Sequence, residues 1–139
     1  MKRLAVFGLF VCVAAGAGCQ SETTQPDYSI VSPVTETFQG TLNQQGAVFY
    51  SFIVGNPDPV SVTLASLTKS SGTAVTTSVR LGFGIPAGET CSTTTALTTA
   101  SGLQAQVLQV ASPGVYCVII SDTGALTEPL NFAIKIKHS

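Results

Sequence analysis

Short stretches in which apolar and polar residues alternate cover most of the chain from residue 34 onward, and they restrict its fold more than any other feature. The clearest stretch is 130–137, in which Phe132, Ile134 and Ile136 share one side. Such a period of two places alternate side chains on opposite faces of a β-strand. No stretch has the apolar spacing of an amphipathic helix, and Gly, Pro, Asn and Asp separate the runs. The pattern therefore predicts an all-β protein.

The positions of the runs and turns predict the strands. We expect strands over residues 34–42, 47–54, 60–67, 77–83, 104–110, 115–121 and 130–137. The Thr-rich segment 84–99 is expected to be a long irregular connection. About seven or eight short strands in about 105 residues predict an antiparallel sandwich of two sheets, jelly-roll-like in arrangement.

The alternation also predicts which side chains form the core between the two sheets. The inward candidates are Phe38, Leu42, Val48, Tyr50, Phe52, Val62, Leu64, Val79, Leu81, Phe83, Val107, Tyr116, Val118, Ile120, Phe132, Ile134 and Ile136. This set is large enough for a single core in a domain of this size.

The chain carries unusually little charge. Charged residues make up 9% of it, against about 25% in typical soluble domains, and Ser, Thr and Gln supply most of the polar surface. The four basic residues after the N-terminal segment do not cluster. Capture of nucleic acid depends on clustered Lys and Arg, so we do not expect a nucleic-acid partner.

The N-terminus has the features of an export signal. Lys2 and Arg3 precede an apolar run of about twelve residues, whereas a membrane-spanning helix needs about twenty. Small residues follow and lead to Cys19, an arrangement that resembles the lipobox of bacterial lipoproteins. The resemblance implies that Cys19 is lipidated and becomes the new N-terminus. Gly16 stands where the lipobox usually has an aliphatic residue, and residues 15–17 also fit an A-x-A signal peptidase site, which would release a soluble protein.

The segment after Cys19 reads as a tether. Residues 20–33 are rich in Ser, Thr, Gln and Pro and offer little to bury. We therefore divide the chain into a signal peptide over 1–19, a polar tether over 20–33 and a β-sandwich domain over 34–139. The expected location is the bacterial cell envelope, lipid-anchored and most simply at the outer membrane, with a periplasmic or secreted protein as the alternative.

Two cysteines remain for the domain, since Cys12 lies in the signal and Cys19 is the expected lipid site. In an exported domain, Cys91 and Cys117 most simply form one disulfide. Cys117 lies between two residues assigned inward, so the bridge should lie on the outer face of a sheet. The sequence offers no Cys or His at the spacing of a metal site, and we expect no metal here.

Four segments of the domain resemble the bacterial pre-peptidase C-terminal (PPC) domain. They are Phe38-Gln39-Gly40-Thr41-Leu42, Phe49-Tyr50-Ser51-Phe52, Pro113-Gly114-Val115-Tyr116-Cys117-Val118 and Asn131-Phe132-Ala133-Ile134. The resemblance covers about residues 34–137 and implies a jelly-roll-like sandwich that is noncatalytic and aids secretion, targeting or binding of polymeric substrates. The chain departs from that family in carrying no attached catalytic domain. It also has Thr77-Ser78-Val79-Arg80 where the family has an acidic D-x-D-like segment, so calcium binding is not carried over.

The residues that catalysis needs are sparse. His138 is the single histidine, and we expect it to be a solvated residue of the tail rather than part of a catalytic triad. The acids Asp27, Glu36, Asp58, Glu89, Asp122 and Glu128 are scattered, mostly at turns, which does not suggest the paired carboxylates of a glycosidase. We therefore expect no enzymatic activity.

Calcium binding and sugar binding are the two binding chemistries that the sequence raises. Asp58, Asp122 and Glu128 could hold calcium if they met at one end of the sandwich, but three carboxylates fall short of the six to eight oxygens that calcium takes, and ordinary turn acids are the simpler interpretation. Sugar stacking requires exposed aromatic rings. The chain has no Trp, Tyr28 lies in the tether, and Tyr50 and Tyr116 are expected to pack inward.

These observations favour a noncatalytic envelope lipoprotein that presents a β-sandwich for binding or adhesion. It would be held on the lipid bilayer through Cys19 and would contact an extracellular polymer or an envelope protein. The alternatives are a structural or assembly scaffold that acts through a sheet edge, and a secreted soluble accessory domain. No cofactor is expected.

Overall fold

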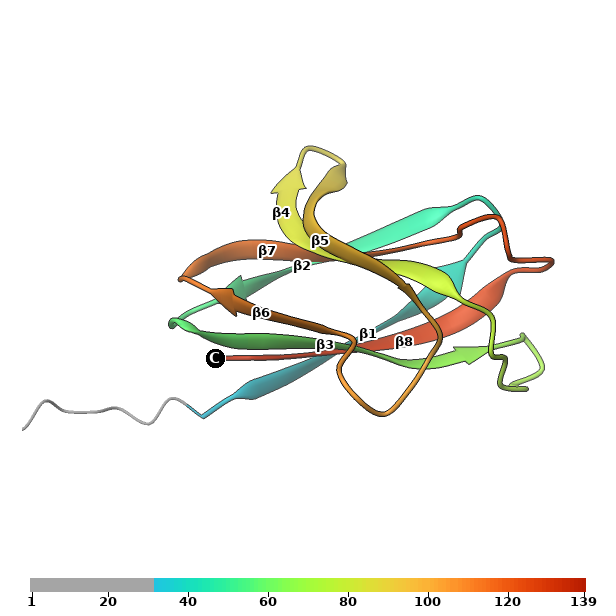
Figure 1. Ribbon diagram of the computed structural model, residues 1–139, viewed down its shortest axis with the longest axis horizontal. Coiled ribbons are helices and arrows are strands. Elements are labelled where there is room, and N and C mark those ends of the chain that lie inside the picture. The colour runs from blue at the N-terminus through green and yellow to red at the C-terminus, as the bar shows by residue number, and fades with distance from the viewer. Residues whose placement is uncertain (1–31) are drawn as a thin grey trace, which may run out of the picture.

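The computed structural model describes residues 32–139, and these residues form two stacked antiparallel sheets without a helix (Figure 1). The eight strands are β1 (Val34–Leu42), β2 (Ala47–Val54), β3 (Asp58–Thr68), β4 (Val79–Ala87), β5 (Thr90–Thr99), β6 (Val107–Ala111), β7 (Gly114–Ser121) and β8 (Leu130–His138). No helix long and apolar enough to cross a membrane occurs in this part of the chain.

The strand order is that of a jelly roll. One sheet has the order β1-β8-β3-β6, which we call sheet A, and the other has the order β2-β7-β4-β5, which we call sheet B. Successive strands thus cross from one sheet to the other, except at the β4–β5 hairpin. The predicted all-β sandwich is confirmed, and so is the predicted jelly-roll-like arrangement.

The core lies between the sheets, where the alternation placed it. Inward residues of both sheets form one cluster, and residues such as Val62, Leu64, Ile120 and Ile134 are fully buried. Every predicted inward residue either belongs to this cluster or packs against it. The cluster also includes residues that the pattern missed, namely Val54, Val60, Leu67, Ala111, Leu126 and Leu130.

The prediction of an irregular segment over 84–99 was wrong. β4 continues to Ala87 and β5 begins at Thr90, so the two strands form a long hairpin. Thr favours strands because its branched side chain suits a pleated surface. A run of threonines without apolar partners looks like a solvated loop in sequence, yet it forms the exposed edge strand of sheet B.

The β4–β5 hairpin curls away from the plane of its sheet at its joined end (Figure 1). The register shifts between Phe83 and Gly84, which leaves Thr94 as an extra residue opposite them. A β-bulge of this kind bends a strand and increases its twist. At Gly84 the curl brings the two backbones so close that a Cβ atom there would clash with the carbonyl of Ser92.

The Cys91–Cys117 disulfide fastens this curl. It joins β5 to β7 across the intervening β4, with a Cα–Cα distance of 5.8 Å. Both cysteines are buried, yet neither belongs to the core cluster. The predicted disulfide is present, and it lies outside the core as expected.

Candidate functional site

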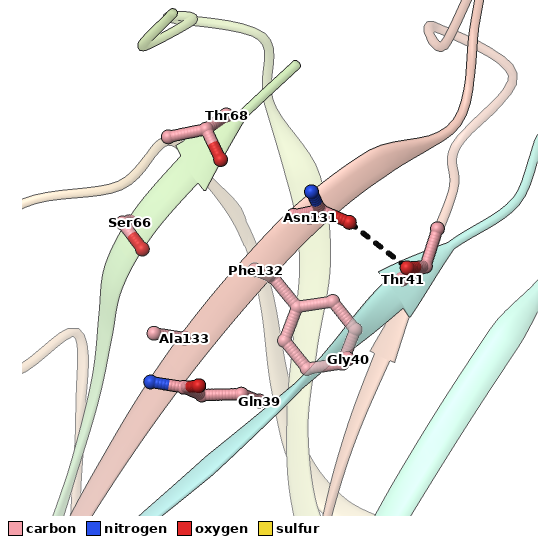
Figure 2. A pocket seen from close by; sticks show the side chains of 8 residues that line it. All are labelled: Gln39, Gly40, Thr41, Ser66, Thr68, Asn131, Phe132 and Ala133. Atoms are coloured by element: carbon pink, nitrogen blue, oxygen red, sulfur yellow. Dashed lines mark hydrogen bonds between the residues drawn. The ribbon is translucent and has the colours of Figure 1, made fainter. Parts of the chain in front are cut away.

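The outer face of sheet A carries a hollow that is lined mainly by uncharged polar side chains (Figure 2). Its volume is about 450 Å³, and three strands contribute to it: β1, β8 and β3. The lining residues are Gln39, Gly40, Thr41, Ser66, Thr68, Asn131, Phe132 and Ala133. We call this hollow the sheet A groove.

Strand register explains why these residues meet. Thr41 lies opposite Asn131, which in turn lies opposite Thr68 on the next strand. One step along the same face, Ala133 lies between Gln39 and Ser66. Directly opposed residues of antiparallel strands point to the same face. Two rows of uncharged side chains, all of them polar except Ala133, therefore cross the sheet side by side.

The hollow exists because its middle position is small and its β3 wall is irregular. Ala133 projects only a methyl group between two longer neighbours. The pairing of β3 with β8 shifts between Leu64 and Ser66, where Ala65 is an extra residue. A bulge re-aims the side chains around it, which moves Ser66 to the rim.

A hydrogen bond orients two of the polar side chains of the groove. The Thr41 hydroxyl donates to the Asn131 side-chain oxygen at 2.9 Å, and Figure 2 shows the Asn131 nitrogen turned away from that bond. No Asp, Glu, Lys or Arg lines the groove. A surface of hydroxyls and amides with no net charge suits a neutral ligand that both donates and accepts hydrogen bonds.

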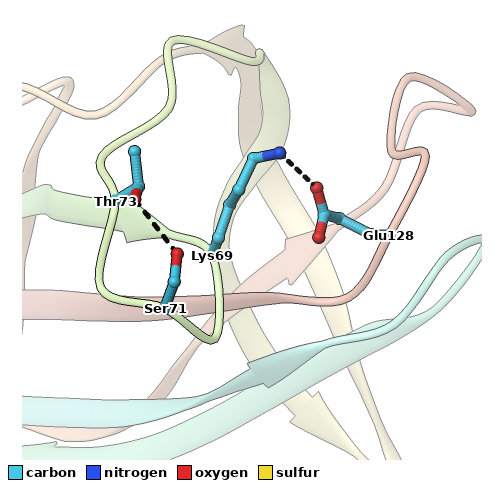
Figure 3. A network of polar contacts seen from close by, with 4 residues as sticks. All are labelled: Lys69, Ser71, Thr73 and Glu128. Atoms are coloured by element: carbon cyan, nitrogen blue, oxygen red, sulfur yellow. Dashed lines mark hydrogen bonds and ion pairs between the residues drawn. The ribbon is translucent and has the colours of Figure 1, made fainter.

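A second, smaller hollow lies at the end of the sandwich where loops 69–78 and 122–129 meet. Its volume is about 180 Å³. Lys69 lies 2.6 Å from Glu128 across it, and the Ser71 and Thr73 hydroxyls are 3.0 Å apart in the adjoining turn (Figure 3). Both members of the ion pair are partly exposed, so it contributes at most about 1 kcal/mol and holds the two loops together.

The three acids weighed for calcium do not meet. Asp58 begins β3 at the end of the sandwich where β2 and β6 finish, whereas Asp122 and Glu128 lie at the opposite end (Figure 1). The Asp122 carboxylate accepts backbone N–H groups from Gln45, Gly124, Ala125 and Leu126 at 2.9–3.2 Å. These bonds, that of Gln45 foremost, lower the pKa of Asp122 below its usual value. Among residues 32–139 no three acidic, His or Cys side chains are grouped as metal ligands.

The expectation that His138 is a solvated tail residue was wrong. It is the last residue of β8, and its side chain points inward with 5% exposure. Its Nε2 lies 2.8 Å from Glu36 Oε1, and its ring packs on Phe52 with a centroid distance of 5.2 Å. No serine is among the described partners of either ring nitrogen. The His138–Glu36 pair therefore closes one end of the core.

The two tyrosines of the domain pack inward, as predicted. Tyr50 stacks on Phe38 with ring centroids 4.6 Å apart, and Tyr116 stacks on Phe83 at 5.3 Å. Their hydroxyls donate to the backbone oxygens of Gln39 and Ser112. Cys19, Tyr28 and Asp27 lie outside the described residues.

Sequence reasoning did not find the sheet A groove. Its members are scattered Ser, Thr, Asn and Gln residues that look like ordinary surface positions, and only the register of β1, β8 and β3 brings them together. The signal that the sequence did offer was the outward position of Asn131 and Ala133 in β8. No protein-family model matches the chain, and a search of curated proteins finds no match either.

Proposed function

We propose that the protein is a noncatalytic lipoprotein of the bacterial cell envelope whose β-sandwich binds a neutral, hydroxyl-rich polymer in the sheet A groove. The observation that carries the proposal is the lining of this groove. Gln39, Thr41, Ser66, Thr68 and Asn131 offer several hydrogen-bond donors and acceptors and no charge. A glycan presents hydroxyl groups that match such a surface, and none of its groups requires a charged partner.

The position of the groove suits a protein that is attached through its N-terminus and keeps the groove accessible to a ligand. The tether reaches the domain at Val34, and the groove begins at Gln39 on the same strand. Strands rise about 3.3 Å per residue, which places the groove about 15–25 Å from the point of attachment. A lipid on Cys19 would thus hold one end of the sandwich near the bilayer and leave the groove accessible. The resemblance to PPC domains, which are appended to secreted hydrolases, supports this proposal.

The groove predicts weak binding of a single sugar. Its aromatic residue, Phe132, is 3% exposed and belongs to the core, so a ligand would gain hydrogen bonds without ring stacking. Hydrogen bonds exchanged with water contribute about 0.5–1.5 kcal/mol each. Useful affinity would therefore come from many domains on one surface that bind one polymer together.

The test is retention of the purified fragment 20–139 on immobilised glycans, peptidoglycan and collagen. We expect retention on a glycan or on peptidoglycan. The variant Ala133→Arg should lose it, because the long side chain fills the groove. The variant Ala47→Arg makes the same change at an exposed position on sheet B and should be retained like the parent. Equal retention of both variants would place binding elsewhere, and retention on collagen alone would contradict the neutral-glycan proposal.

A further inference from the structure

Strand β6 is an exposed apolar edge of sheet A. It is the outermost strand of the order β1-β8-β3-β6, and β3 is its one partner in that sheet. Its outward side chains Leu108 and Val110 are 66% and 83% exposed. Edge strands are usually guarded by charge or proline because their free backbone groups can pair with another chain. No charged residue occurs between Glu89 and Asp122, and no proline lies within β5 or β6, so neither strand has such a guard.

The opposite side of the sandwich differs, because side chains close it. There β1 and β2 form the edges of the two sheets, and Phe38 on β1 stacks on Tyr50 of β2. The Tyr50 hydroxyl also donates to the backbone oxygen of Gln39 at 2.8 Å. A backbone acceptor on the β1 edge is therefore already occupied from within the molecule.

The segment before β6 completes the edge of β3 and leaves β6 itself outermost. Gly102 donates its backbone N–H to Leu64, and Gln106 donates to Val62. The Gln106 side chain accepts the N–H of Leu64 at 2.7 Å. The backbone of β3 is thus paired along this length, and an added strand would have to pair with β6.

We propose that β6 pairs with β6 of a second copy of this chain, antiparallel and centred on Gln109. In this register Leu108 lies opposite Val110 of the second copy, and Val107 lies opposite Ala111. The two outward pairs bring four exposed apolar side chains into one cluster on the outer face of the joined sheet. The dimer has an eight-stranded sheet in place of two four-stranded ones.

The sequence of β6 favours a second copy over an unrelated strand. Read from Gln109 in either direction, VLQVA presents an outward apolar residue first and an inward one second. Antiparallel pairing about a two-fold axis places outward residues opposite outward ones in any strand, and here both of those residues, Leu108 and Val110, are exposed and apolar. Identical charged edges would repel each other, whereas this edge carries no charge. The two-fold arrangement also closes, so it yields dimers and not fibres.

The dimer is tested on the mature protein, exported from the full chain and purified in mild detergent, by sedimentation velocity over a range of concentrations. We expect a concentration-dependent dimer. The variant Val110→Lys should weaken it about tenfold or more, because two cross-strand apolar pairs are lost and two lysines meet apolar neighbours. The matched control is Ile53→Lys, which changes another exposed apolar residue, on β2 of sheet B, and should leave the dimer intact.

A double variant tests the register. Leu108→Glu combined with Val110→Lys places each glutamate opposite a lysine of the second copy, so dimerisation should return. It also shows that the lysine itself permits folding. A monomeric parent protein, an unaffected Val110→Lys dimer or equal loss with Ile53→Lys would each overturn the proposal. Failure of the double variant to dimerise would overturn the register centred on Gln109. Glycan retention by the groove is a separate readout.

Discussion

At the scale of single residues, Phe52 is central to one end of the core. Its side chain is 3% exposed and lies near Phe83, Tyr116 and the ring of His138, with centroid distances of 5.2–6.3 Å. Replacing Phe52 by Ala should lower the free energy of unfolding by about 3–5 kcal/mol, the usual range for a buried aromatic residue. Urea-induced unfolding measures the loss.

The neighbouring Phe49 provides the matched control. It lies on the opposite face of β2 and is only partly buried. Phe49→Ala should therefore cost less than Phe52→Ala. Equal losses for the two variants would mean that β2 faces the core differently from the arrangement described here.

Asp122 makes the free energy of unfolding of the domain depend on pH. Backbone N–H groups, first that of Gln45, stabilise its charged form and lower its pKa. A carboxyl group whose pKa is lower in the folded state stabilises the fold above its unfolded-state pKa, and this stabilisation is lost as the pH falls through the folded-state pKa. The variant Asp122→Asn should therefore be less stable than the parent at about pH 7, with the difference shrinking towards about pH 2.

Thermal unfolding at several pH values checks this expectation. Glu89→Gln serves as the control, because Glu89 is an exposed acid at the tip of the β4–β5 hairpin. It should not reproduce the pH-dependent difference. A difference for Asp122→Asn that is constant from neutral to acid pH would contradict the proposed role of its ionised carboxylate.

Individual burial was largely predictable from the sequence. The alternation in β8 placed Phe132, Ile134 and Ile136 correctly, and the same parity continues to His138. We expected His138 to lie in a frayed end because it is polar and next to the C-terminus, although the alternation of β8 predicts that it faces inward. The pairing with Glu36 depends on Glu36 being the inward residue opposite Ile136, which requires the register of β1 against β8. The sequence alone does not supply that register.

At the scale of elements, the disulfide and the β4–β5 hairpin form one unit. The bridge closes a loop with a sequence separation of 26 residues, which corresponds to about 3 kcal/mol in the chain-entropy model. The double variant Cys91→Ala/Cys117→Ala should melt at a lower temperature than the parent but keep its far-UV β-sheet signal. The reason is that the core cluster does not include either cysteine.

Circular dichroism during heating provides both readouts. Mass spectrometry of the exported parent protein, digested without reductant, should show the Cys91 and Cys117 peptides linked. Free thiols at both positions would contradict the bridge. Complete unfolding of the double variant would show that the core cannot support the fold without it.

Strand boundaries were predictable where apolar residues alternate and not where threonines dominate. The predicted ranges for β1 and β2 agree with the structure, whereas β5 was missed. In β5 only Cys91 is buried, so few positions on either side need an apolar residue and a period of two is weak there. The sheet A groove and the β6 edge depend on strand order, and strand order arises from long-range packing that no short window of sequence contains.

At the scale of the whole molecule, the two ends of the sandwich differ in the segments that they carry. Strand β1 begins at Val34, beside the turns that join β2 to β3 and β6 to β7, while the loops that contain Asp122 and Glu128 lie at the far end (Figure 1). The groove occupies the outer face of sheet A towards that far end. The groove therefore lies away from the end of the sandwich at which β1 begins.

Anchoring through Cys19 would determine where in the cell the whole molecule resides. The variant Cys19→Ala should shift the protein from the membrane fraction to the soluble fraction of cells, because the cysteine is the expected site of lipid attachment. One acyl chain gives only marginal, reversible membrane binding, so stable anchoring needs the several chains of a lipoprotein. The control is Cys12→Ala, which leaves the proposed attachment site intact and should stay with the membrane. Immunoblots of the two fractions measure the distribution. If the parent and Cys19→Ala distribute equally, the protein is not held by lipid at this residue, and cleavage after Ala17 becomes the better account of its export.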